Sequence, residues 1–323
     1  MYFMSATEKD TGGLISVIIP CFNYGRYLHA ALESLRKQTY TVWEAIVVDD
    51  GSTDDTRNVA EKFAALDKRI CCISQQQKGI SAARNAGLAI AKGEFVQFLD
   101  ADDLLEPRKF EIQLQYFKGH PDVELVYGSA RYFSDQHPAE RLLSMDGKNR
   151  AWMPNVSSQG GRVLEHLVQS NIMVVSSPLL RRRSLDRIGL FDEKLSASED
   201  WDLWIRCALQ DTVFHYLEEP DSFTLIRYHR NSYSKNSLRM YTTALELLAR
   251  YEKTIQEERL CRLMRKASSE FGLQLAFENI RRRNTLIGIK QLFKFSFMWI
   301  DVKLFLNGAR LLRLPGKPDA QSE

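Results

Sequence analysis

Two carboxylates one residue apart follow a buried apolar run. Residues 94–99 have the composition of a β-strand, and Asp100 and Asp102 come directly after them. Ligands of open α/β sheets bind at the carboxyl ends of the strands, so both side chains can turn toward one ligand. Hard cations such as Mg²⁺ or Mn²⁺ are commonly held by a few carboxylates together with substrate phosphates. The spacing indicates a metal-bridged diphosphate on a nucleotide-activated substrate, with a plain solvated loop as the alternative.

A second acidic pair follows another apolar run at residues 45–48. Asp49 and Asp50 are adjacent there, and a carboxylate at a strand end can accept hydrogen bonds from a nucleotide base or a ribose hydroxyl. Residues 51–54 have the composition of a tight turn before a helix, with Asp54 as the expected N-cap. An ordinary strand-turn-helix junction accounts for that turn but not for the two acids.

Several single side chains are also suited to binding. Phe22 follows the first strand, where it could stack on a base while Asn23 hydrogen-bonds nearby, although a turn with a core aromatic is the simpler interpretation. Arg84 lies in the first turns of an alanine-rich helix, where a cation can meet phosphate oxygens. His229 follows a later strand and could complete a Mn²⁺ site, whereas a lone histidine is more often structural. The sequence has neither a dinucleotide-binding glycine motif nor a Walker A motif.

Three acids and two tryptophans lie within residues 199–204. Aromatic faces pack on the C–H surfaces of sugars, and a carboxylate such as Asp200 can take a hydroxyl proton as a general base. The structural alternative is a capping box formed by Ser196 and Glu199, because acids favour the first turn of a helix.

The elements that must position these residues are regular in the first 130 positions. Apolar, β-branched runs alternate with helical patterns of about ten residues, which predicts βαβ units and a mostly parallel sheet covered on both faces. The acidic clusters follow the strands and should therefore meet at one edge. The expected strands are 15–19 (ended by a proline), 45–48, 70–73 and 95–99, and the expected helices are 27–37, 56–66, 81–92 and 107–117.

The second half is less regular. It suggests a mixed sheet that completes the first domain, followed by a helical appendage. Strand patterns occupy 125–133, 173–180 and 223–228, and a helical pattern occupies 200–209. The expected divisions are a flexible tail at 1–13, an α/β domain at 14–237, a helical region at 238–315 and a tail at 316–323.

The composition is that of an ordinary globular protein, with 44% hydrophobic and 26% charged residues among 323. Residues 239–323 carry 16 Lys and Arg against 9 Asp and Glu, whereas the rest of the chain is mildly acidic. Five scattered cysteines without a C-x-x-C pair suit a reducing compartment. Neither a signal-peptide pattern nor an apolar stretch of ~18 residues is present, so we expect a cytoplasmic protein.

A basic, aromatic segment lies near the C-terminus. Residues 286–314 combine large apolar side chains with lysines and arginines. Such a segment could lie in a membrane interface, which would place the protein at the inner face of the cell membrane. The alternatives are that its helices pack on the α/β domain or form a homodimer.

Taken together and in this order, the segments resemble family 2 of the glycosyltransferases. That family has the nucleotide-diphospho-sugar transferase fold called GT-A, a Rossmann-like α/β sheet with helices on both faces. The resemblance spans roughly residues 14–235 and rests on six stretches, which are 17–23, 47–54, 83–87, 98–103, 199–204 and 229–234.

The resemblance implies a role for each matching position on the donor side. Pro20, Phe22 and Asp50 would hold the nucleotide base, Asp49 would support that pocket, and Arg84 would face the donor.

The resemblance also implies the catalytic machinery. Asp100 would contact the ribose or the water shell of a divalent metal, Asp102 would bind that metal, and His229 is similar to a position that touches the metal or the diphosphate in some members. Asp200 would be the general base.

These roles imply an inverting transferase. It would move one sugar from a nucleotide-diphospho-sugar, with UDP as the expected nucleotide, to a hydroxyl of a glycan or lipid-linked acceptor in cell-surface polysaccharide assembly. The Q-x-x-R-W segment and spanning helices of the family's processive synthases are absent, which favours single-sugar transfer.

Two other classes of function remain. A nucleotidyltransferase would need a glycine-rich loop with Arg and Lys after the first strand, where this chain has Phe22-Asn23-Tyr24-Gly25-Arg26. A non-catalytic sugar-nucleotide or membrane-binding protein would not need the full set of acids. A nucleic-acid partner is not expected, because the basic residues lie in the apolar tail.

Overall fold

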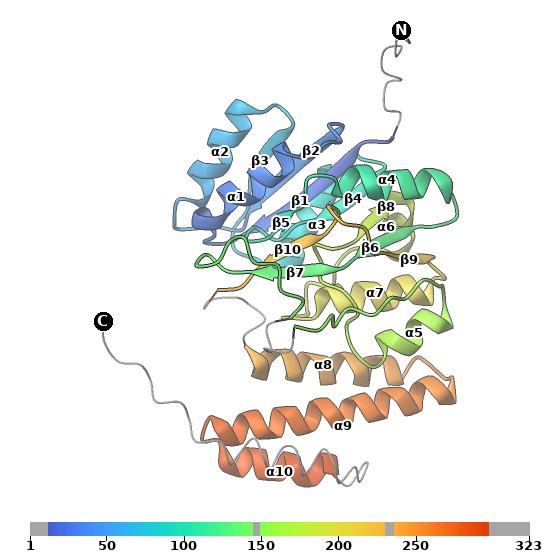
Figure 1. Ribbon diagram of the computed structural model, residues 1–323. Coiled ribbons are helices and arrows are strands. Elements are labelled where there is room, and N and C mark those ends of the chain that lie inside the picture. Colours follow the sequence, from blue (N-terminus) through green and yellow to red (C-terminus); the bar gives the residue numbers. More distant parts are fainter. Residues whose placement is uncertain (1–11, 145–148, 230–235, 297–323) are drawn as a thin grey trace. The chain divides into compact units, whose positions relative to one another are not determined.

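The chain folds as two compact units in a computed structural model (Figure 1). The structure describes residues 12–144, 149–229 and 236–296. The first unit contains the strands and the helices α1 to α7, and the second contains α8 to α10 together with the short segments 168–170 and 196–198. The domain limits expected from the sequence stay a prediction.

The first unit is built on a seven-stranded sheet in the order β3-β2-β1-β4-β8-β6-β9. Strand β8 runs antiparallel to both of its neighbours, whereas the other adjacent pairs are parallel. The mostly parallel α/β sheet predicted from the sequence is confirmed. The strands are β1 (Ile15–Cys21), β2 (Trp43–Asp49), β3 (Ile70–Ser74), β4 (Phe95–Phe98), β6 (Leu125–Gly128), β8 (Leu179–Arg181) and β9 (Phe214–Leu217).

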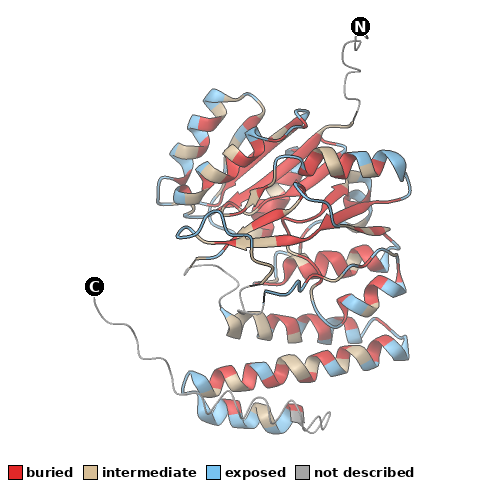
Figure 2. Cartoon of the chain, viewed as in Figure 1, coloured by how far each residue is buried: buried red, intermediate tan, exposed pale blue. Residues whose placement is uncertain are grey.

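Helices cover both faces of the parallel half. Alternate residues of β1 and β2, such as Val17 and Val47, form one buried core with α1 (Gly25–Arg36), α2 (Thr56–Leu66) and α4 (Lys109–Gly119). The intervening residues Ile18 and Val48 face α3 (Ile80–Ile90). The approach there is so close that a Cβ on Gly87 would lie 2.5 Å from Ile18, which explains a glycine inside this helix. Figure 2 shows β1, β2 and β4 almost uniformly buried.

The second half of the first unit departs from the sequence prediction at two strands. The single strand expected at 125–133 is two strands in different sheets, because Gly128 exchanges hydrogen bonds with the Ser177 hydroxyl where the chain changes sheet. The strand expected at 173–180 begins only at Leu179. Ser176 and Ser177 before it use their side chains to hold neighbouring loops.

A small three-stranded sheet and three helices complete this unit. Its strands lie in the order β5-β10-β7, with β5 (Leu104–Leu105), β7 (Ala130–Phe133) and β10 (Thr224–Arg227). The helices are α5 (Gly161–Leu167), α6 (Arg182–Ile188) and α7 (Glu199–Leu209). The helix predicted at 200–209 is α7, and the strand predicted at 223–228 is β10.

The second unit is helical, as the pattern after residue 238 predicted. Helix α9 (Glu258–Arg281) packs against both α8 (Ser237–Glu252) and α10 (Thr285–Ser296). Among the described residues, we find no helix with the length and apolar character needed to cross a membrane. Residues 297–314 of the basic, aromatic segment lie outside the described residues.

Candidate active site

The carboxyl ends of β1, β2 and β4 lie next to one another, as predicted from the acids that follow the strands. Cys21 at the end of β1 pairs with Asp49 at the end of β2, and its carbonyl accepts a hydrogen bond of 2.8 Å from Asp50 N. The amide of Leu99 donates to Ile18 O at 3.0 Å and continues β4 alongside β1. The two acidic clusters therefore follow the strands on either side of β1, at the same edge of the sheet.

Pro20 lies inside β1, which continues to Cys21 rather than ending before the proline. The backbone groups of successive residues in a strand point alternately to the two neighbouring strands. Ile18 O points to β4, because it accepts from Leu99 N, so the backbone nitrogen of Pro20 points to β4 as well. The β1–β4 ladder ends at Phe98, so the missing N–H of Pro20 leaves no strand group without its partner.

The loops that follow β1 and β2 are tied together. Asn23 has a positive φ of 59°, and its side-chain oxygen accepts from Thr53 N at 2.8 Å, while its own amide donates to Ser52 Oγ. The Asp49 carboxylate accepts from Ser52 N at 3.0 Å. Phe22, which directly precedes Asn23, is 37% exposed, so its ring is accessible for stacking.

Asp50 holds the start of α3. Its carboxylate accepts from Lys78 N and Gly79 N, both at 2.8 Å, and from the Gln75 amide at 2.7 Å. A carboxylate has about four acceptor positions, so a base N–H or a ribose hydroxyl would share oxygens that already fix this loop.

The predicted N-cap lies one residue too early. Asp55 is at the N-cap of α2, and no side-chain capping bond is formed there. Asp54 instead accepts from Gly25 N at 3.0 Å and from Thr56 N at 2.9 Å. Its carboxylate thus joins the starts of two helices, which a local capping pattern does not reveal.

Arg84 connects the two acidic regions of the site. Its guanidinium donates from Nη2 to Asp100 Oδ1 at 2.9 Å and from Nη1 to Glu199 Oε1 at 2.6 Å, and the residue is only 1% exposed. Glu199 is the first residue of α7, so the capping box expected from Ser196 is wrong. The Glu199 carboxylate pairs with Arg84 instead of turning back to cap its own helix.

Burial and mutual repulsion disfavour the ionised forms of the acids after β4. Burial raises the pKa of Asp100, Arg84 opposes that rise, and the charge of Asp102 adds to it. Burial raises the pKa of Asp103 well above its usual range, and Asp102 and Asp100 reinforce the rise. This cluster would be stabilised by an additional cation.

Asp102 and His229 meet at the same end of the site. Asp102 Oδ2 lies 2.8 Å from His229 Nε2, and the Tyr27 ring stacks on the imidazole with centroids 4.7 Å apart. The described residues include no group of three or more His, Cys, Asp or Glu side chains arranged around a metal. An acidic cluster with one or two ligand side chains suits Mg²⁺ or Mn²⁺, since these ions leave positions to diphosphate oxygens and water. The residues present therefore fit a divalent cation.

Asp200 lies in the first turn of α7 beside Glu199. Its Oδ2 accepts from the Asn171 side-chain amide at 2.9 Å and its Oδ1 accepts from Trp201 N at 2.7 Å. Burial, reinforced by the charge of Glu199, raises the pKa of Asp200 to about 7. A carboxylate with a pKa near neutrality is suited to accept a proton.

The neighbouring side chains of α7 have structural roles. Trp201 and Trp204 are buried, so the expected packing of their faces on a sugar is wrong. Asp202 is buried and pairs with Arg206 at 2.9 Å. Of the three acids in this cluster, Asp200 is the one that remains partly exposed.

Three residues near the site were missed in the sequence. Asn171 holds Asp200; the Ser176 hydroxyl accepts from Asp100 N and donates to Asp103; and Arg227 donates to the Asp102 carbonyl at 3.0 Å. Arg227 lies two residues before His229, so its position in the sequence could have identified it as a residue near the site. Asn171 lies in irregular chain without a periodic pattern, and Ser176 lies in a stretch whose sequence looks like a strand.

Replacement of Asn171 by alanine should weaken the function of Asp200 without unfolding the protein. The hydrogen bond from Asn171 lowers the pKa of Asp200, so its loss should raise that pKa. If Asp200 is the base, we expect kcat to fall roughly tenfold at neutral pH and the acid limb of the pH profile to move to higher pH. An unchanged pH profile would contradict this role.

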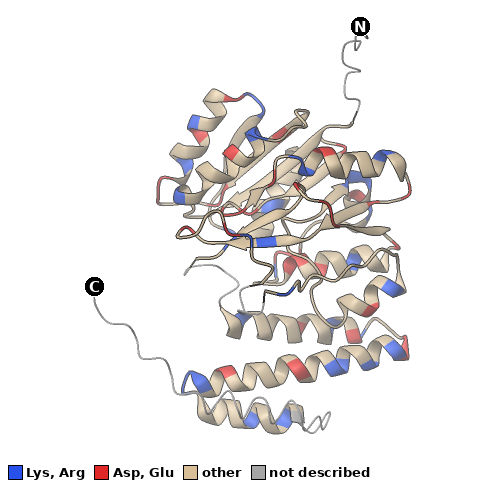
Figure 3. Ribbon diagram, in the orientation of Figure 1, with Lys and Arg blue, Asp and Glu red and all other residues tan. Residues whose placement is uncertain are grey.

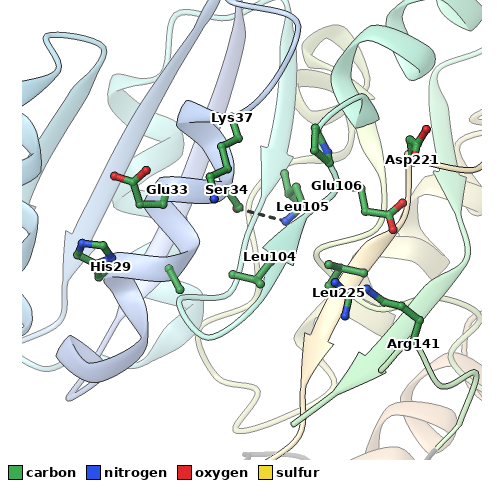
Figure 4. Close-up of a pocket in the computed structure, with 12 residues that line it drawn as sticks. His29, Glu33, Ser34, Lys37, Leu104, Leu105, Glu106, Arg141, Asp221 and Leu225 are labelled. Atoms are coloured by element: carbon green, nitrogen blue, oxygen red, sulfur yellow. Dashed lines mark hydrogen bonds between the residues drawn. The ribbon is translucent and has the colours of Figure 1, made fainter. Parts of the chain in front are cut away.

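A hollow of about 520 Å³ lies elsewhere in the first unit (Figure 4). It is lined by His29 and Glu33 of α1, by Lys37 directly after this helix, by residues 104–107, and by Arg141 and Asp221. Among the described residues, its lining includes none of the predicted site residues.

Comparison with known proteins identifies the family. The family model described as Glycosyl transferase family 2 matches residues 16–189, which is more than half of the chain. The chain belongs to glycosyl transferase family 2. Asp200 and His229 lie beyond the matched residues of this family 2 chain, so their roles stay predictions.

The curated relatives include uncharacterized glycosyltransferases. That of Methanocaldococcus jannaschii is 30% identical over 209 residues, which cover 64% of this chain and 68% of the relative. That of Rickettsia typhi is 29% identical over 201 residues, which cover 62% of this chain and 60% of the relative. The matches span about three fifths to two thirds of these relatives' own length.

Solved structures confirm the predicted GT-A fold. A mannosyltransferase from Pyrobaculum calidifontis, in complex with GDP-Man and Mn²⁺, has a TM-score of 0.61 at 18% identity and covers 97% of this chain and 84% of its own. S. aureus TarS in complex with UDP has a TM-score of 0.55 at 21% identity. This match covers 81% of our chain and 69% of the TarS chain.

Proposed function

We propose that this family 2 glycosyltransferase inverts the anomeric centre while it moves one sugar from a nucleotide-diphospho-sugar to an acceptor hydroxyl. The observation that carries the proposal is the position of Asp200. Its carboxylate has a pKa of about 7, is held by Asn171, and lies next to the Glu199–Arg84–Asp100 ion-pair chain. These two ion pairs connect the helix that carries the candidate base to the acids at the sheet edge.

The proposed chemistry assigns each step to a residue. Asp200 takes the proton of the acceptor hydroxyl, and the oxygen attacks the anomeric carbon from the face opposite the nucleoside diphosphate. The new bond to oxygen forms as the bond to the diphosphate breaks, so the configuration inverts. Arg84 holds Asp100 and the start of α7 in a fixed relation during transfer. A divalent cation bound at Asp102, with His229 beside it, would neutralise charge on the departing diphosphate.

The donor side is supported by the sheet edge and by the family. The accessible Phe22 and its neighbour Asn23 follow the end of β1, which adjoins the end of β2 with Asp49 and Asp50. Structures similar in fold are in complex with UDP, UDP-GlcNAc or GDP-Man. We propose a UDP-sugar donor, a glycan or lipid-linked acceptor in cell-surface polysaccharide assembly, and action at the inner face of the cell membrane.

A thermal-shift panel of UDP-, GDP- and dTDP-sugars with Mn²⁺ or EDTA tests the donor proposal. We expect one donor class to raise the melting temperature, and we expect this shift to require the metal and to be lost in the Asp102→Ala variant. A donor present at about 100 times its Kd should stabilise the fold by about 2.7 kcal/mol. Equal stabilisation in EDTA, or in Asp102→Ala, would contradict the assigned metal site.

A further inference from the structure

The chain around α10 has an unusual charge pattern. Residues 279–300 contain five Lys or Arg residues and no Asp or Glu. The basic residues are Arg281, Arg282, Arg283, Lys290 and Lys294. Figure 3 shows the two lysines of α10 as blue bands along a helix that has no red one.

One side of α10 is fixed against α9. A Cβ on Gly272 of α9 would lie 2.3 Å from the Phe295 ring, and a Cβ on Gly288 of α10 would lie 2.7 Å from Ala276 O. The Asn279 side chain donates to Gln291 Oε1 at 2.9 Å. These close approaches determine which side of α10 faces outward.

The outward side carries large apolar residues beside the lysines. Leu286 is 78% exposed and Phe293 is 64% exposed. At 100° per residue, Ile289, Phe293, Leu286, Lys290, Lys294 and Ile287 follow one another around this side, so the lysines border an apolar stripe. We call these six residues the outer face of α10. Figure 2 shows the exposed positions on this helix.

We propose that the outer face of α10 docks on an anionic lipid surface, with the helix lying in the plane of the interface. An apolar stripe bordered by lysines matches a surface that is apolar below and negatively charged at its headgroups. The apolar side chains would enter the acyl boundary while Lys290 and Lys294 reach lipid phosphates. The described residues offer no helix able to span a membrane, so this contact is peripheral.

Charge disfavours a second copy as the occupant. A symmetric dimer through the outer face would place Lys290 and Lys294 near the same lysines of the partner, and α10 has no acid to compensate them. The nearest acid before α10, Glu278, already binds Arg281 at 2.8 Å and Arg282 at 2.7 Å. Anionic lipid supplies the missing negative charge.

Flotation of the full chain with vesicles tests the docking. The chain should float with phosphatidylcholine vesicles that contain about 30% phosphatidylglycerol, should stay behind with pure phosphatidylcholine, and should be released as salt is raised. Each basic residue near an anionic surface contributes about fivefold to binding, so K290E/K294E should lower the partition coefficient roughly 30-fold or more. L286S/F293S should lower it roughly tenfold or more.

Matched control variants distinguish an effect of the outer face of α10 from a general effect of surface charge or hydrophobicity. K62E/K118E makes the same charge change at exposed positions of α2 and α4, and L66S/L190S removes side chains that are 74% and 59% exposed. Both controls should float like the wild type. Equal flotation of the α10 variants and the wild type, or no wild-type flotation, would overturn the proposal. So would a dimer in light scattering that the α10 variants dissociate. Flotation does not read transfer activity, so its outcome is independent of the proposed reaction.

Discussion

We expect the Asp200→Asn variant to lose transfer activity by a factor of about 10²–10⁴ in kcat while it still binds the donor. Asparagine keeps the shape of the side chain but cannot accept the acceptor proton. Asn171 would then face an amide instead of a carboxylate. A coupled assay for nucleoside diphosphate release measures the turnover, and the thermal shift with donor measures binding. Full activity of this variant would show that another group is the base.

The wild-type pH profile provides an independent readout of the same group. A base must be ionised, and the pKa of Asp200 is raised to about 7. As the pH falls below about 7, the carboxyl of the free enzyme takes up a proton, and kcat/KM should fall about tenfold per pH unit; above that value kcat/KM should be constant. Asp186→Asn on α6, an isosteric change at an exposed acid, serves as the control and should leave rate and profile unchanged.

The Arg84→Met variant should be the least stable of the single substitutions discussed. It removes the cation that binds Asp100 and Glu199 and leaves buried carboxylate charge without a partner. Removal of one partner from a buried ion pair costs about 3–5 kcal/mol. For a domain of this size, the melting temperature should fall by roughly 10 °C, which calorimetry or circular dichroism measures.

An exposed arginine supplies the comparison for Arg84. Arg57 on α2 pairs with Glu61 at 2.8 Å, and both side chains are more than half exposed. Arg57→Met should therefore leave the melting temperature nearly unchanged. If Arg84→Met were equally mild, its guanidinium would not be the element that holds the two acidic regions together.

The parallel half of the fold was predictable because its signals are local. Residues 45–48 are a β-branched run without polar alternation, and residues 56–66 repeat at the period of a helix that matches α2 in both bounds. The second half follows contacts between distant segments. Residues 173–178 look like a strand, but Ser176 and Ser177 bind the loop after β4 and the end of β6 instead.

The candidate site divides in the same way. Asp49, Asp50, Asp100 and Asp102 could be found because acids at the ends of buried parallel strands must share an edge. The partner of Arg84 on α7 could not, because nothing in residues 83–87 specifies a carboxylate 115 residues later. The role of Asn171 could not be predicted from the sequence either, because its contact with Asp200 depends on where α7 begins in space.

The order of strands in the sheet has a consequence for synthesis of the chain. Strand β4 lies between β1 and β8, yet residues 99–178 separate it from β8 in the sequence. While that stretch emerges from the ribosome, β1 to β4 can already associate, and β4 then has an open edge of unpaired N–H and C=O groups with no strand beside it. An open edge of this kind is a template for pairing with another chain. Nascent-chain aggregation and chaperone binding should therefore peak after residue 98 and fall once β8 has been made.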